Sequence, residues 1–127
     1  MKKIGFISKN KIFVQSLAAL ITKLPDLGFE PYLLLNIHQA VLDAEVLSID
    51  VAVVDMVAEL PEQTKEVLQI CGDLRHAVPA CRILLLVPQD IKDSRDAALK
   101  AVNCRSADDY VFYDLSLDYL LAKLLVL

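Results

Sequence analysis

The chain has 127 residues, of which 56% are hydrophobic, and a formal net charge of −4 at pH 7. This is the size of one ordinary domain with an ample core, so we expect residues 1–127 to form a single domain. The acidic balance argues against direct nucleic-acid binding. No apolar run approaches the ~18 residues of a membrane-spanning helix, so we expect no membrane contact.

Three cysteines, Cys71, Cys81 and Cys104, are widely spaced and form no Cys-x-x-Cys pair. An odd number at this spacing supports neither a disulfide framework nor a zinc site. We therefore expect buried, reduced thiols, which behave as small hydrophobes, in a cytoplasmic protein.

The first predicted unit is a short apolar strand over 3–7 followed by a helix that runs to about Leu24. Polar side chains at 8–10 can cap the start of this helix. Turn residues over 25–28 end it.

The second unit is a strand over 29–35 and a helix over 37–47 that Asn36 can cap. Pro31 cannot donate a ladder hydrogen bond, which predicts that this strand lies near a sheet edge or has Pro31 at its start. The expected apolar stripe of the helix is Ile37, Val41, Leu42 and Val46.

The third strand is predicted over 49–55, an almost wholly apolar run that ends at Asp55. Continuous apolar runs are typical of parallel strands covered on both faces, so this should be a central strand. Pro61 suits the first turn of the helix that follows. The expected buried stripe of that helix is Val67, Ile70, Cys71 and Leu74.

The last two strands are predicted over 82–87, which Pro88 ends, and over 109–113. An alanine-rich helix lies between them, with a shallow apolar face. Ser116 caps a final helix. Its expected inward residues are Leu117, Leu120, Leu121 and Leu124.

Five strands alternating with five helices predict an α/β fold, a doubly wound parallel sheet with right-handed crossovers. In such sheets functional groups collect outside the carboxyl ends of the strands. Those ends are 8–9, Asp55, 87–88 and 113–114.

The segment Ala-Asp-Asp-Tyr-Val over 107–111, followed by a Leu-rich helix, and the Asp that closes the third strand carry a family resemblance. Over essentially its whole length the chain resembles the receiver domain of bacterial two-component response regulators, the CheY-like superfamily. The resemblance implies a flavodoxin-like (βα)5 fold with strand order 2-1-3-4-5. It also implies that Asp55 occupies the position of the phospho-acceptor.

Aspartyl phosphorylation needs a divalent cation and positive or donor groups around the acceptor carboxylate. Receivers hold Mg²⁺ with an acidic pair after the first strand, and Mg²⁺ prefers oxygen ligands. The resemblance puts Ser8 and Lys9 at these positions. A hydroxyl and an ammonium cannot replace two carboxylates, so we expect no metal site and no cofactor.

Two further positions of the receiver pattern also differ. The Ser/Thr that bonds the phosphoryl group corresponds to Val87 or Pro88, and neither side chain can donate. The conserved Lys corresponds to Tyr113, followed by an acidic residue that would repel a phosphorylated carboxylate. The loop after Asp55 departs too, because Pro61 comes late and no Gly follows.

These losses favour a degenerate receiver, or pseudo-receiver, that signals by protein–protein interaction with a signalling partner or a fused output domain. One hypothesis is that Lys9 pairs with Asp55 and replaces the charge of the metal, although such a pair is weak evidence for stability. The other interpretation is that Lys9 simply points to solvent, since Lys is rarely buried.

Tyr110 corresponds to the aromatic residue whose rotamer reports activation in receivers, or is simply half-buried packing on an edge strand. The fourth helix, fifth strand and fifth helix form the face that receivers use for dimerisation or effector contact. In this chain that face would include Tyr119, so we expect a homodimer or a partner there.

The first alternative function is a working receiver that a histidine kinase phosphorylates on Asp55. A second is a flavin- or nucleotide-binding flavodoxin-like protein, but the loop over 8–11 lacks the glycines that would bring N–H groups to a phosphate. No catalytic motif is present, so we expect no enzyme. His38 and His76 have no paired nucleophile or ligand and should be surface residues.

Overall fold

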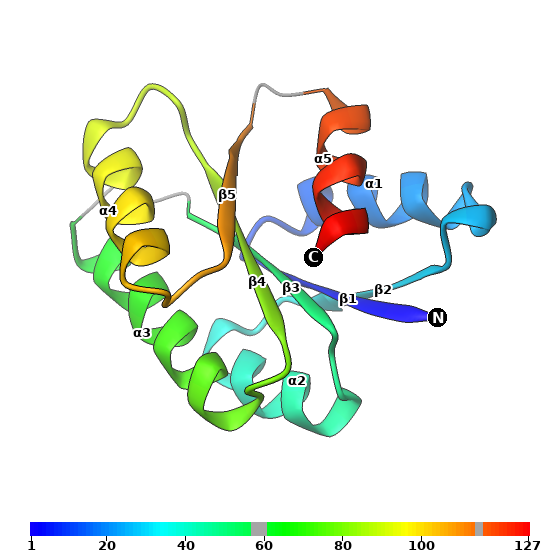
Figure 1. Cartoon of the computed structure of the whole chain (residues 1–127), viewed down its shortest axis with the longest axis horizontal. Coiled ribbons are helices and arrows are strands. Elements are labelled where there is room, and N and C mark those ends of the chain that lie inside the picture. Colours follow the sequence, from blue (N-terminus) through cyan, green and yellow to red (C-terminus); the bar gives the residue numbers. More distant parts are fainter. Residues whose placement is uncertain (57–60, 114–115) are drawn as a thin grey trace.

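The computed structural model describes residues 1–56, 61–113 and 116–127. In these residues five parallel strands form one sheet in the order β2-β1-β3-β4-β5 (Figure 1), which confirms the predicted fold and strand order. The strands are β1 (Lys2–Ile7), β2 (Phe29–Leu34), β3 (Val51–Asp55), β4 (Arg82–Val87) and β5 (Asp109–Phe112).

Helices cover both faces of the sheet (Figure 1). Buried residues of α1 and α5 pack with one face of the strands, and those of α2, α3 and α4 pack with the other. The helices are α1 (Lys11–Thr22), α2 (Ala40–Leu47), α3 (Pro61–Ala77), α4 (Lys92–Asn103) and α5 (Leu117–Val126). None of the described helices has the length and hydrophobicity that a membrane crossing requires.

β3 is buried at every residue, as its continuous apolar run predicted. Val51 and Val53 belong to the core shared with α1 and α5, whereas Ala52 and Val54 belong to the opposite core. Neighbouring residues of a strand point to opposite faces, so a strand sandwiched between two helix layers needs apolar side chains throughout. This burial fixes Asp55 at the carboxyl edge of the sheet.

The predicted start signals of three helical segments are confirmed. Asn10 Oδ1 accepts a hydrogen bond from the Phe13 N–H, and Ser116 Oγ accepts one from the Tyr119 N–H. Asn36 caps a 3₁₀ turn over Ile37–Gln39 that leads into α2. Each cap satisfies a backbone donor that the first turn leaves without a partner.

The edge position predicted from Pro31 is confirmed, since β2 is an outer strand. The predicted stripe of α2 is wrong at two positions, because Leu42 is 54% exposed and Val46 74% exposed. Ala40 and Ala44 are buried instead. Residues four apart share a helix face, so once this alanine pair faces the core, side chains two residues further on face solvent.

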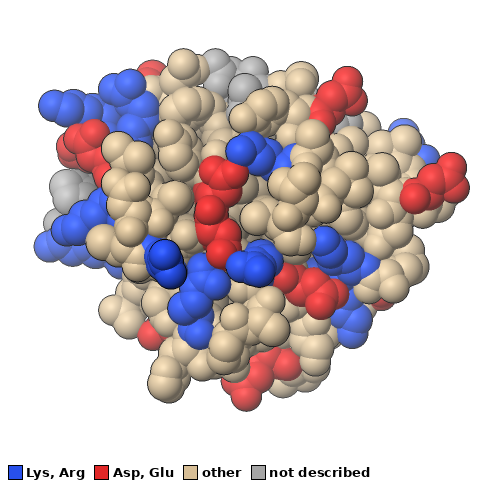
Figure 2. Space-filling view, viewed as in Figure 1, with Lys and Arg blue, Asp and Glu red and all other residues tan. Residues whose placement is uncertain are grey.

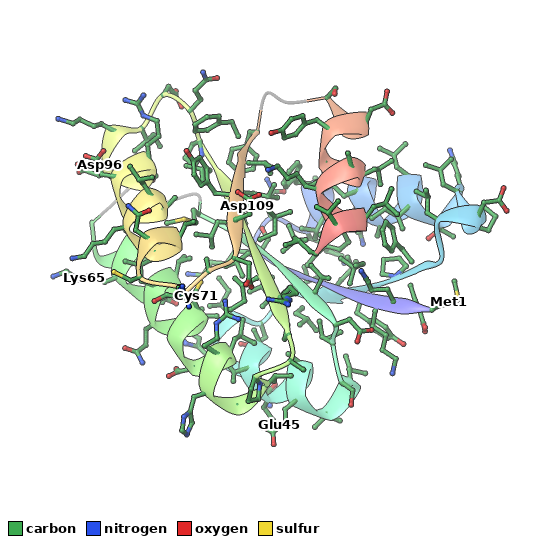
Figure 3. All side chains as sticks on the ribbon, viewed as in Figure 1. Met1, Glu45, Lys65, Cys71, Asp96 and Asp109 are labelled. Atoms are coloured by element: carbon green, nitrogen blue, oxygen red, sulfur yellow. The ribbon has the colours of Figure 1, made fainter. Side chains whose placement is uncertain are left out.

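Cys71 on α3 (Figure 3) and Cys81 are buried free thiols, as predicted. Burial raises the pKa of Cys71 to about 12 and that of Cys81 to about 11, which keeps both thiols protonated and unreactive. The prediction of burial is wrong for Cys104, which is exposed. It lies at the end of α4, where the chain leaves the helix and the core.

Candidate functional site

The strand ends predicted to carry function do meet at one edge of the sheet. Ile7 pairs with Val54 between β1 and β3, Asp55 pairs with Leu86 of β4, and Val87 pairs with Phe112 of β5. The residues at and directly after these pairs therefore share the carboxyl edge. Asp55 is central among them.

Asp55 is a buried carboxylate, only 8% exposed, with a buried hydroxyl beside it. Ser8 Oγ donates a hydrogen bond to Asp55 Oδ2 over 2.6 Å and accepts one from the Asn10 N–H over 3.0 Å. The first turn at α1 thus orients the Ser8 hydroxyl, and the hydroxyl in turn contributes to holding the carboxylate. Both roles of the hydroxyl are used within the protein.

These residues do not fit the Mg²⁺ site of a receiver. The Ser8 hydroxyl already accepts a hydrogen bond from the Asn10 N–H and donates one to Asp55 Oδ2. Mg²⁺ needs several oxygen ligands in near-octahedral geometry. In residues 1–56, 61–113 and 116–127, no group of three or more His, Cys, Asp or Glu side chains lies close enough together to hold a metal.

The hypothesis of a Lys9–Asp55 ion pair is wrong. Lys9 is exposed, and the ion pairs found among the described residues do not include it. The exposure of Lys9 fits the alternative interpretation that its side chain points to solvent.

Val87 and Pro88, which the resemblance predicts at the position of the phosphoryl-binding Ser/Thr, are both buried. Tyr113, which the resemblance predicts at the position of the conserved Lys, packs its ring edge-on against Phe13 of α1 with centroids 5.3 Å apart. Its hydroxyl is buried and has no hydrogen-bond partner in the described part of the chain. None of these three residues adds a positive charge to the surroundings of Asp55.

Tyr110 is half-buried and packs edge-on against Phe112, with ring centroids 5.6 Å apart. This contact fits the interpretation that Tyr110 is half-buried packing. Its role as an aromatic that reports activation stays a prediction. The loop between β3 and α3 and the acidic residue after Tyr113 lie outside the described residues. His38 and His76 are both exposed, as predicted.

Sequence reasoning missed a second carboxylate, Asp108, at the opposite edge of the sheet. It accepts hydrogen bonds from Arg75 Nη2 at 2.9 Å, Arg82 Nη1 at 3.3 Å and the Ile83 N–H at 2.7 Å. Desolvation by burial raises the pKa of this carboxyl, but the Ile83 N–H and the two guanidiniums outweigh it, and the pKa is lowered. No local pattern pointed to this cluster, because its members come from three separate segments.

Comparison with known proteins rests on structure, since no protein-family model matches the chain and no curated protein matches it in sequence. A response regulator from Burkholderia pseudomallei with a phosphorylated aspartic acid is 23% identical (TM-score 0.75), over 96% of this chain and 65% of that chain. The chain thus spans about two thirds of that regulator's length.

Two other solved structures are matched over nearly their whole length. A CheY-like receiver domain from Methanospirillum hungatei is 16% identical (TM-score 0.76), covering 98% of this chain and 90% of that chain. A two-component response regulator from Clostridium difficile is 21% identical (TM-score 0.75), with 98% and 93% covered. The fold of the chain is therefore that of response-regulator receiver domains.

Proposed function

We propose that the chain is a pseudo-receiver, a signalling domain that acts by protein–protein interaction without phosphorylation and without catalysis. The observation that carries this proposal is the hydrogen bond from Ser8 Oγ to Asp55 Oδ2, at 2.6 Å. In a working receiver an acidic pair and its metal would lie beside the acceptor. Here a neutral hydroxyl, with both its hydrogen-bonding roles used, lies there.

The electrostatics around Asp55 also support the proposal. A phosphorylated aspartate carries about two negative charges, which require a metal, a cation or several donors nearby. Lys9 is exposed, Val87 and Pro88 offer no side-chain donor, and Tyr113 offers a neutral hydroxyl. The buried carboxylate then serves the structure of the carboxyl edge.

The expected partner is a signalling protein or a fused output domain, bound to the face of α4, β5 and α5. Exposed apolar side chains on these helices support this, since Leu99 is 50% exposed, Tyr119 45% and Leu125 53%. A homodimer through the same face is the second candidate. Light scattering across a concentration series separates the two, because only a homodimer changes mass with concentration.

The proposal includes a cytoplasmic location, which the free cysteines support.

A working receiver phosphorylated on Asp55 is the second candidate function, favoured by the burial of Asp55 at the end of β3. Incubation with acetyl phosphate and Mg²⁺, followed by intact-mass measurement, distinguishes the two functions. A receiver domain that accepts phosphate from the same donor is the positive control. We expect the mass of this chain to stay unchanged. A single added phosphoryl group that disappears in Asp55→Asn would overturn the pseudo-receiver proposal.

A further inference from the structure

An open pocket of about 460 Å³ lies at the amino edge of β4 and β5, the edge opposite Asp55. Its walls come from the last turn of α3, the first residue of β4, the last turn of α4 and the connection from α4 to β5. The lining residues are Arg75, Arg82, Val102, Arg105, Ala107 and Asp108. Its volume is within the range of small-molecule sites, roughly 300–1,000 Å³.

The pocket carries a local excess of positive charge in an acidic protein. Three guanidiniums and one carboxylate leave two formal positive charges, whereas the whole chain carries −4. Figure 2 shows Lys and Arg atoms in separate groups across the face in view, with Asp and Glu atoms between them near its middle. The excess of two positive charges within one pocket suits a small anion.

The hydrogen bonds to Asp108 explain why two of the three arginines, Arg75 and Arg82, lie in this pocket. Arg75 and Arg82 each donate to the carboxylate, and Arg75 Nη1 also donates to the Cys81 carbonyl over 3.4 Å. Arg82 keeps most of its guanidinium available, since its side chain is 59% exposed. A purely structural role for the cluster accounts for these contacts but not for Arg105.

Arg105 lies where its own backbone disfavours an arginine. Its φ is +63°, in the left-handed region, and it follows the end of α4 in a Schellman-type motif. The Arg105 N–H donates to the Val102 carbonyl, and the Ser106 N–H to the Ala101 carbonyl. Glycine is the usual residue at this position, because a Cβ is strained there. The Arg105 side chain is exposed, and none of the hydrogen bonds or ion pairs found among the described residues involves it.

We propose that Arg105, Arg82 and Arg75 form a binding site for a small molecule that carries phosphate groups. A planar guanidinium presents paired N–H donors that match two phosphate oxygens. Asp108 accepts hydrogen bonds from Arg75 and Arg82 and so orients their guanidiniums. Val102 and Ala107 supply a short apolar wall beside them. The site is independent of Asp55 and goes beyond the proposed function.

The test is a titration of ¹⁵N-labelled protein with inorganic pyrophosphate at constant ionic strength, followed by NMR. We expect saturable shifts centred on the amides of the three arginines. Arg105→Gly removes the guanidinium and the backbone strain together, so we expect about tenfold weaker binding, as for loss of a charged hydrogen bond, with a melting temperature about 3 °C higher. Arg95→Ala, which removes an exposed arginine from the first turn of α4, is the matched control and should bind as the wild type does.

Three outcomes would overturn the proposal. The first is the lack of saturation by pyrophosphate at millimolar concentration. The second is an equal response of Arg105→Gly and Arg95→Ala, which would indicate non-specific charge attraction. The third is stronger binding of a hexaglutamate peptide than of pyrophosphate, which would point to an acidic protein segment.

Discussion

Two carboxylates lie at opposite edges of the same sheet, and their surroundings differ in charge. Asp55, at the carboxyl end of β3, has the neutral Ser8 hydroxyl beside it. Asp108, just before β5, has two guanidiniums and a backbone N–H. Among the described residues, the side chain that hydrogen-bonds Asp55 is therefore a neutral hydroxyl, whereas those that hydrogen-bond Asp108 are cationic guanidiniums. Position in a fold marks where a family's chemistry lies, but only the neighbouring charges decide whether a chain can perform it.

The largest expected effect is on stability at the Asp108 edge. Asp108→Asn removes the charge that Arg75 and Arg82 share, and we expect a loss of about 3 kcal/mol in the free energy of unfolding, measured with urea. Asp109→Asn is the matched control. Asp109, on β5 beside α5 (Figure 3), pairs with Lys123 at 2.6 Å, both about one third exposed, so its loss should cost only about 0.5–1 kcal/mol. Equal losses in the two variants would show that the arginine cluster contributes no more to the free energy of unfolding than the Asp109–Lys123 pair does.

The second effect concerns Asp55. Ser8→Ala leaves its buried carboxylate without the hydroxyl donor, and we expect a loss of about 1–2 kcal/mol by urea denaturation. Ser16→Ala is the control, because the Ser16 hydroxyl is exposed and donates only to the Ile12 carbonyl of its own helix. That variant should stay within about 0.5 kcal/mol of wild type. A Ser8→Ala protein as stable as Ser16→Ala would mean that the hydrogen bond does not hold Asp55.

A smaller loss of stability is expected at low pH. The pKa of Asp108 is lowered below its ordinary value of 3.8 in the folded protein. Its contribution to stability is therefore complete above that value and is lost as pH falls through the folded pKa. Urea midpoints between about pH 6 and pH 2.5 should fall more steeply for wild type than for Asp108→Asn. Parallel curves would exclude Asp108 from the acid response.

The fold was predictable because its main signals are local. The apolar run that ends at Asp55, Pro31 in an outer strand and the cap at Ser116 each act within a few residues. The alanine pair that faces the core from α2 was not predictable, because tertiary packing rather than hydrophobicity selects the buried face of so short a helix.

The sites divide in the same way. The position of Asp55 followed from the strand pattern. The proposed ion pair was wrong, since charge suggested Lys9, whereas the Ser8 hydroxyl donates to Asp55 and Lys9 is exposed. The contact of Arg75 with Asp108 joins residues 33 positions apart. No periodicity or spacing encodes such a pair, so only the folded structure shows it.

The most direct test of the pseudo-receiver proposal is the affinity of the chain for Mg²⁺, measured by the shift of the Asp55 and Ser8 amides in NMR titrations. Ser8→Asp/Lys9→Asp, which restores an acidic pair beside Asp55, is the positive control and should bind Mg²⁺ and gain thermal stability from it. We predict no saturable Mg²⁺ binding at this edge in the wild type. Saturable binding by the wild type that disappears in Asp55→Asn would contradict the account.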